Sequence, residues 1–196
     1  MLLALATEDR LSEAVALRLL NNYPSITVGN CIRRNGNGYL RQRMPAFSEM
    51  ARQMPVLVLT DLDTALCPAT LRQSWMRGIP HPRRLLLRVA EREIESWLLA
   101  DHEAIVALMG KPMRRRLPDH PDGLPDPKAF LLTLASKAAR DVRRDLLPEP
   151  GAIASKWLGY NDRLCDLVRT SWCPRRAAQR SPSLHRAMVR ILELIS

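Results

Sequence analysis

Two carboxylates follow an apolar run in the first third of the chain. Residues 55–59 read Pro-Val-Leu-Val-Leu, and Asp61 and Asp63 come shortly after them. A short apolar run is typical of a buried strand in a parallel sheet, and ligands of such sheets collect beyond the carboxyl ends of the strands. Because side chains alternate along a strand, Asp61 and Asp63 would lie on the same side and could share a hard cation. An isolated pair of this kind can equally open a turn or cap a helix.

Other acidic residues follow other predicted strands. Glu8 comes after an apolar run near the N-terminus, and Glu91, Glu93 and Glu95 come after the fourth such run. A spacing of four would place Glu91 and Glu95 on one face of a helix, with Glu93 offset, although acids also favour the start of any helix. If the strands share one sheet, these carboxylates meet at one edge, and their mutual repulsion calls for a divalent cation with oxygen ligands. We therefore predict a Mg²⁺ or Mn²⁺ site there.

The elements that must position these acids alternate between strand and helix patterns. This order predicts an α/β fold with a doubly wound, mostly parallel sheet flanked by helices. A proline-rich connector follows, and then helical patterns only, which predicts an α/β core over residues 1–110 and a helical extension over 111–196 packed on the core. The predicted strands are 2–6, 26–32, 55–59 and 84–90; the predicted helices are 11–20, 39–54 (broken or started by Pro45), 67–76, 128–146, 152–170 and 183–195.

The charge balance favours a polyanionic partner. The formal net charge is +10, and of 30 basic residues only four are lysine. Guanidinium groups pair bidentately with phosphate, so nucleic acid is the expected partner, although a compositional bias of the genome or a solvated basic face would give the same count. The candidate nucleic-acid contacts are Arg33 and Arg34 on an early loop, Arg114, Arg115 and Arg116 on the connector, and Arg175 and Arg176 near the C-terminus.

The remaining composition excludes several classes of protein. The four cysteines have neither the spacing nor the histidine partners of a zinc site, so we expect reduced thiols in a cytoplasmic protein. No stretch reads as a membrane span or a signal peptide. The four tryptophans are expected in the core rather than as platforms for base stacking.

Taken together, these segments resemble the Toprim fold of topoisomerases, bacterial primases and OLD-type nucleases. The likeness is carried by Glu8 and the helix pattern after it, by Asp61-Leu62-Asp63 with Cys67-Pro68, and by the stretch 88–101, and it is strongest with small OLD-related Toprim proteins of bacterial genomes, often beside defence or mobile elements. The segments 126–128, 159–161 and 181–184 also recur in such proteins. One departure is Asp9, where many Toprim enzymes have glycine.

The resemblance implies a function and a set of roles. Glu8 would be the general acid or base, Asp61 and Asp63 would bind Mg²⁺, and Glu95, with Glu91 or Glu93, would complete the acidic edge. OLD-type nucleases also use a lysine near the metals, for which Lys128 is the candidate. The implied activity is metal-dependent phosphodiester chemistry on nucleic acid, that of a nuclease. DNA is expected ahead of RNA as the partner, although RNA stays open.

Two other interpretations remain open. A non-catalytic Toprim-like subunit that binds a partner ATPase would keep the same acidic edge. The segment from Asp61 to Leu66 also resembles the nucleophile loop of haloacid-dehalogenase phosphatases, but Ala65 stands where that loop has threonine or valine.

Overall fold

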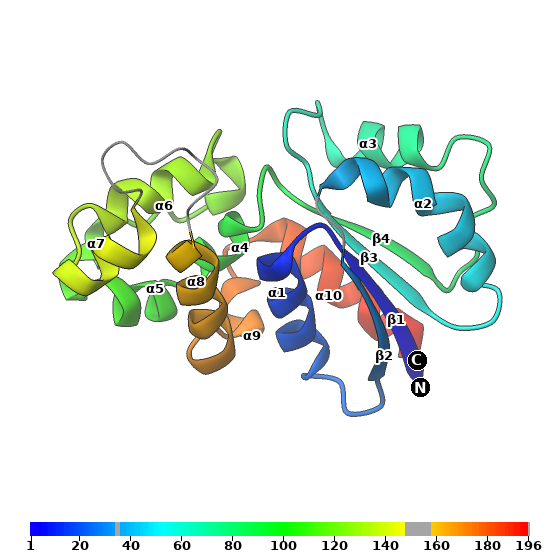
Figure 1. Cartoon of the computed structure of the whole chain (residues 1–196), viewed down its shortest axis with the longest axis horizontal. Helices are drawn as coiled ribbons and strands as arrows, with labels where there is room; N and C mark the ends of the chain where they lie inside the picture. The colour runs from blue at the N-terminus through cyan, green and yellow to red at the C-terminus, as the bar shows by residue number, and fades with distance from the viewer. Residues whose placement is uncertain (34–35, 148–157, 196) are drawn as a thin grey trace.

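The computed structural model describes residues 1–33, 36–147 and 158–195, and within them it contains one parallel sheet (Figure 1). The spatial order of the strands is β2-β1-β3-β4, and every neighbouring pair is parallel. The strands are β1 (Leu2–Thr7), β2 (Thr27–Arg33), β3 (Val56–Asp61) and β4 (Leu85–Ala90). The predicted α/β class with a doubly wound sheet is confirmed.

Helices cover both faces of the sheet because the apolar residues of the inner strands point alternately to either side. Leu3 and Leu5 of β1 belong to the core on the side of helix α1 (Arg10–Leu20). Ala4 and Ala6 belong to a second core, on the side of α2 (Asn37–Met50) and α3 (Pro68–Trp75). A strand buried on both faces reads as a continuous apolar run, which is why the sequence pattern located β1, β3 and β4 well.

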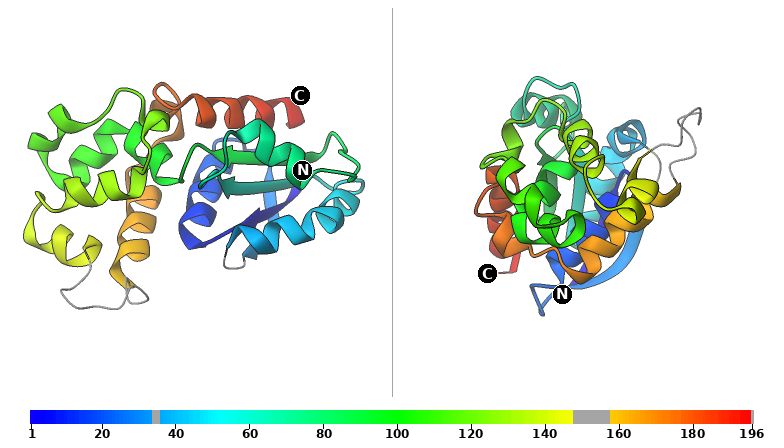
Figure 2. Two further views of the ribbon diagram at one scale, coloured as in Figure 1. Left: turned by 90° about the horizontal axis from the view of Figure 1, so that it is seen from above. Right: turned by 90° about the vertical axis from the view of Figure 1, so that its left-hand side faces the viewer.

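The later elements that the structure describes are helices, and they join the core on the α1 side. Helix α10 (Pro182–Ile195) returns to the sheet and packs against β4, with Leu184, Ala187 and Ile191 in that core (Figures 1 and 2). None of the helices in the described ranges is long and apolar enough to cross a membrane. The other elements are α4 (Glu95–Ala100), α5 (His102–Met109), the 3-10 helices η1 (Lys111–Arg116) and η2 (Pro121–Gly123), α6 (Pro127–Ala135), α7 (Arg140–Leu146), α8 (Leu158–Thr170) and α9 (Pro174–Ala177).

Two tryptophans join helices that are far apart in the sequence. Trp97 and Trp172 are fully buried, as predicted for core residues. Trp97 donates its indole N–H to Ser183 Oγ (2.7 Å), and Trp172 donates to the carbonyl of Trp97 (3.0 Å). Each buried indole thus has the hydrogen-bond partner that its burial requires.

Two helix predictions are corrected by the structure. Helix α2 continues through Pro45. Proline has no N–H to donate to the carbonyl one turn earlier, but Pro45 lies on the exposed face, where water can bond to that carbonyl. The helix predicted over 128–146 is broken at 136–139, where the backbone N–H groups of Lys137 and Ala138 bond three residues back and end α6. The break lets α7 pack on α8, so tertiary packing overrides the local helix preference. The predicted helix 152–170 is described only from residue 158 onward.

Replacing Gly159 with alanine is expected to destabilise the fold by about 1–3 kcal/mol. A Cβ at this position would lie 2.6 Å from the backbone carbonyl oxygen of Asp145, so α7 and α8 would have to move apart. Chemical denaturation of the two chains measures the difference. Gly38→Ala is the matched control, because its Cβ would meet nothing within 4 Å, and an equal loss in both variants would contradict the explanation.

Candidate active site

Glu8 and Asp61 meet where the connections of the sheet diverge. From the central strands β1 and β3, the chain runs outward to β2 on one side and to β4 on the other. Such a switch point is where open α/β sheets bind their ligands. Glu8 follows β1, and its Oε1 accepts hydrogen bonds from the backbone N–H of Asp61 (2.9 Å) and from the hydroxyl of Thr60. The structure therefore brings together Glu8 and Asp61, which the sequence pattern placed after two different strands.

The carboxylate of Asp61 is buried on one side and incompletely paired. Asp61 is the last residue of β3, opposite Ala90 of β4, and its Oδ1 is buried without a hydrogen-bond partner. Burial raises the pKa of Asp61 well above its usual range, and the nearby charges of Glu95 and Glu8 raise it further. An uncompensated buried carboxylate is costly, so this position favours either a proton or a cation.

The Glu8 carboxyl is shifted in the same direction. Burial raises the pKa of Glu8, the hydrogen bonds from Thr60 and from the Asp61 backbone lower it, and the charges of Asp63 and Asp9 raise it again. A raised pKa suits a group that must accept and release a proton near neutral pH. Asp9 also has a structural role, because its Oδ1 accepts the backbone N–H of Ser12 (2.8 Å) and caps α1.

Asp63 reaches the same edge by a route that the sequence did not predict. The strand ends at Asp61, and Asp63 has a left-handed backbone (φ 49°), so the predicted alternation along a strand was wrong. Its backbone N–H donates to the carbonyl of Arg92 (2.8 Å), and its Oδ2 accepts from Asn37 Nδ2 (2.7 Å). Arg92 is also left-handed (φ 61°) and donates to the carbonyl of Asp63 (3.1 Å). The turn is thus fixed by reciprocal contacts that offset its backbone strain.

Glu95 is the member of the later acidic group whose charge acts on Asp61. Its side chain is buried, with only 5% of the residue exposed, and its Oε1 accepts the hydroxyl of Tyr160 (2.8 Å). Burial raises the pKa of Glu95 to about 7, although the hydrogen bond from Tyr160 opposes the shift. The same carboxylate raises the pKa of Asp61, which links α4 to the carboxyl end of β3.

Glu91 and Glu93 point to other partners. Helix α4 begins only at Glu95, so the prediction that Glu91 and Glu95 share a helical face is wrong. Glu91 forms a salt bridge with Arg186 of α10 (2.8 Å). Glu93 Oε2 accepts the backbone N–H of Lys128 (2.9 Å), and burial raises its pKa.

Lys128 lies beside the acidic edge, at the start of α6. Its ammonium is 5.0 Å from the ring centroid of Tyr160, and its charge lowers the pKa of Glu93 and Glu95. Asp126 caps the helix by accepting the backbone N–H of Ala129 (2.7 Å). The structure thus joins two of the recurring segments, 126–128 and 159–161, at one place. Tyr160 had no role in the sequence analysis, and its place in the Gly-Tyr-Asn segment was the one signal available.

The ligand chemistry of this edge fits a hydrated divalent ion rather than a closed protein cage. Among the described residues, no three acidic, histidine or cysteine side chains are arranged to hold a metal ion. Mg²⁺ usually needs fewer protein ligands, because it binds through one or two carboxylates and keeps waters and substrate phosphates in its remaining positions. Asp61, with its unpartnered buried Oδ1, and Asp63, whose charge acts on Asp61, are carboxylates of that type.

The predicted nucleic-acid contacts that the structure describes have other partners than the acids of this edge. Arg33 ends β2 at the same carboxyl edge, opposite Thr7, but its guanidinium is 3.5 Å from Glu13, while Arg34 lies outside the described residues. The exposed residues 114–116 lie on η1, which packs against α5 in the helical part of the molecule. Neither Arg33 nor any of residues 114–116 forms a salt bridge with Glu8 or Asp61 in the part of the chain that the structure describes.

Arg176 has a structural role instead of the predicted one. Its guanidinium donates two hydrogen bonds of 2.8 Å to Asp101, which is fully buried and caps α5. It also donates to the carbonyl of Ser171 (2.9 Å). The buried carboxylate thereby obtains the charge partner that it needs. Arg175, on the same short helix, is exposed, and its charge acts on Tyr23.

Comparison of the chain with protein-family models, with curated proteins and with solved structures gives no match. The functional assignment therefore depends on the geometry and chemistry of the edge itself.

Proposed function

We propose that the protein cleaves phosphodiester bonds of nucleic acid in a reaction that depends on Mg²⁺ or Mn²⁺. The observation that carries this proposal is the buried, unpartnered Oδ1 of Asp61 at the switch point of the sheet, with the charges of Glu8 and Glu95 acting on it. A carboxylate in such a position binds a cation or a proton more readily than it remains alone. The resemblance of these segments to OLD-type Toprim nucleases agrees with the proposal.

The residues would divide the chemistry as follows. Asp61 and Asp63 would hold the ion, which when bound neutralises phosphate charge and lowers the pKa of a bound water. Glu8, with its raised pKa, would take the proton from the attacking water. Lys128 would stabilise negative charge on the phosphate, since its ammonium lies on the Tyr160 side of the edge. The charge of Glu95 would keep the pKa of Asp61 raised until a cation binds.

Replacing Asp61 with alanine is expected to reduce Mn²⁺-dependent cleavage of plasmid and single-stranded DNA at least about a hundredfold, because it removes a ligand of the ion. Asp166→Ala is the matched control, since Asp166 is an exposed aspartate on α8 that pairs with Arg169 (3.1 Å). Cleavage by purified protein is followed on gels with and without a chelator.

Cleavage that survives in Asp61→Ala would indicate a contaminating nuclease and contradict the proposal. Absence of cleavage by the wild-type protein, with DNA and with RNA, would favour the non-catalytic alternative, in which the acidic edge serves the assembly with a partner ATPase.

A further inference from the structure

Four arginines converge in a pocket at the β4 edge of the sheet. Arg72 comes from α3, Arg88 from β4, and Arg186 and Arg190 from α10. The pocket has a volume of about 380 Å³, and its lining is completed by His185 and Val189. It lies where helices from the two opposite faces of the sheet approach each other around the last strand (Figure 2, left).

The alternation of β4 explains how the pocket forms. Leu86 and Ala90 face the core on the α1 side, whereas Leu87 faces the core on the α2 side. Arg88 therefore points to the α1 side, where α10 packs on β4. Arg72 belongs to α3 on the opposite face and reaches the pocket around the free edge of the strand.

The inner guanidinium groups have few partners. Nε of Arg72 is buried and has no hydrogen-bond partner, and Nε of Arg88 donates only to the carbonyl of the preceding residue (2.8 Å). Burial, together with the charges of Arg72, Arg190 and Arg186, lowers the pKa of Arg88 to about 10. Four like charges in one pocket are mutually repulsive, which a multivalent anion would relieve.

Carboxylates of the chain neutralise only the outer pair of arginines. Arg186 bonds to Glu91 (2.8 Å) and Arg190 to Glu193, and both guanidinium-bearing side chains are more than half exposed. No carboxylate among the described residues forms a salt bridge with Arg72 or Arg88. The inner half of the pocket thus keeps an excess of positive charge and donors.

We propose that this pocket binds a phosphate group, from a nucleic-acid backbone or as a free phosphate. A phosphate group offers several oxygens to a set of guanidinium forks that a single carboxylate cannot saturate. The pocket is also larger than one ion needs, which leaves room for the groups attached to a backbone phosphate. It adjoins the carboxyl edge, since Arg88 is opposite Leu59, two residues before Asp61 on β3. The inference concerns binding alone and does not require that the protein cleaves DNA.

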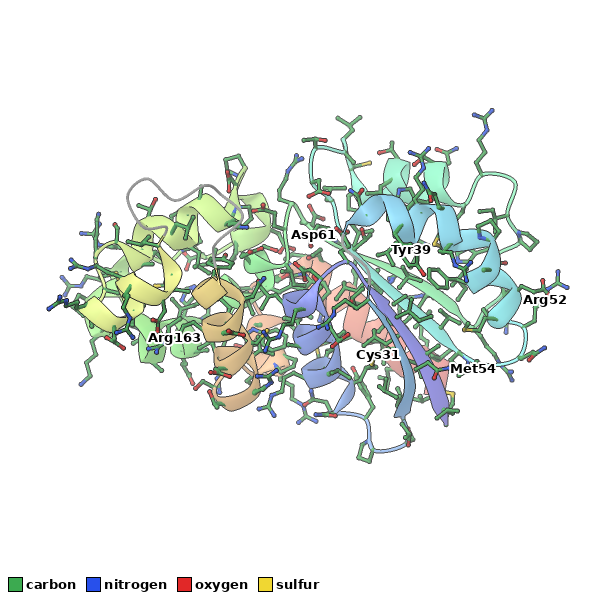
Figure 3. All side chains as sticks on the ribbon, viewed as in Figure 1. Cys31, Tyr39, Arg52, Met54, Asp61 and Arg163 are labelled. Carbon is green, nitrogen blue, oxygen red and sulfur yellow. The ribbon has the colours of Figure 1, made fainter. Side chains whose placement is uncertain are left out.

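The test compares the wild-type protein with Arg72→Gln, with Arg72→Gln/Arg88→Gln, and with the control Arg52→Gln, which removes an exposed arginine of the same charge (Figure 3). Binding of inorganic phosphate and pyrophosphate is measured by calorimetry, and binding of a short labelled single-stranded DNA by anisotropy at several salt concentrations, all in chelator. The double variant is expected to bind these phosphate ligands at least about tenfold more weakly than the wild-type protein does. The slope of its DNA affinity against salt concentration should fall by about 0.7 for each backbone phosphate that the variant no longer binds.

The outcomes separate the two sources of phosphate. Weaker binding of DNA and of free phosphate supports a backbone site, and weaker binding of free phosphate alone supports a site for the free ion. The proposal is overturned if the double variant binds DNA and free phosphate as tightly as the wild-type protein does. It is also overturned if polyglutamate, a polyanion without phosphate, competes for the wild-type protein as well as phosphate does. Because the substitutions remove like charges, the melting temperature of the double variant should equal or exceed that of the wild-type protein. If the double variant does not fold, the binding measurements on the single variant Arg72→Gln test the proposal. Because no metal is present, failure here is distinguishable from failure of the cleavage assay.

Discussion

Replacing Asp61 with asparagine is expected to stabilise the metal-free protein by about 1–3 kcal/mol and to abolish its stabilisation by Mn²⁺. The substitution keeps the shape of the side chain but removes a buried negative charge whose Oδ1 has no hydrogen-bond partner. In the wild-type protein, burial raises the pKa of Asp61, and Glu95 and Glu8 raise it further, so ionisation of this group opposes folding at neutral pH.

The substitution is thus expected to stabilise the metal-free protein and to remove the stabilisation by Mn²⁺. Together these two effects would identify Asp61 as a carboxylate that is costly to bury without a cation. An ion that binds only the folded state stabilises it by about 2.7 kcal/mol at a hundred times its Kd. Urea denaturation in chelator and in Mn²⁺ measures both effects, with Asp166→Asn as the matched control at an exposed aspartate. If the wild-type protein gained nothing from Mn²⁺, or if Asp61→Asn gained as much, the assignment of Asp61 as a ligand would be wrong.

The second large effect is a dependence of stability on pH that originates in Glu95. Its pKa is about 7 in the folded protein against an ordinary value of 4.5, so the folded state holds the proton more tightly than the unfolded state. The resulting stabilisation is complete below about pH 4.5 and is lost as the pH rises through about 7. For Glu95 alone, the free energy of unfolding should fall by about 2 kcal/mol between about pH 5.5 and about pH 8.

Glu95→Gln removes the titrating group and keeps its hydrogen bond, because the glutamine oxygen can still accept the hydroxyl of Tyr160. Asp61 and Glu8 shift in the same direction and remain in both chains. The difference between the two unfolding free energies, measured in chelator across the pH range, therefore reports Glu95 together with the effect of its charge on Asp61. A difference that does not change with pH would show that Glu95 is ionised in the folded protein at every pH tested.

The acids at strand ends could be predicted from the sequence because both their signals are local. A buried strand leaves an apolar run, and the residue after it must emerge at the edge of the sheet, which places Glu8 beside Asp61 once β1 and β3 are neighbours. The position of Asp63 could not be derived in the same way, because the strand ends at Asp61 and a turn held by Arg92 and Asn37 takes over.

Choosing among the later acids required information that lies far along the chain. Glu95 bonds to the hydroxyl of Tyr160, which is 65 residues away, whereas Glu91 bonds to Arg186. These distant partners distinguish the two glutamates. The same limit applies to the arginines. Charge counting cannot show that Arg176 is paired with a buried aspartate, nor that Arg72 and Arg88 meet around the edge of a strand.

The return of α10 to β4 has a consequence for biosynthesis. One face of the sheet, which is built from residues 2–90, is completed only by α10, which begins at Pro182. A nascent chain therefore displays part of that apolar face until the residues of α10 have left the ribosome. Exposed apolar surface and late, long-range closure are the conditions under which a folding chain is most prone to aggregate. A fragment restricted to residues 1–110 would keep this exposure permanently, so expression of the isolated α/β portion should depend on chaperones far more than expression of the whole chain.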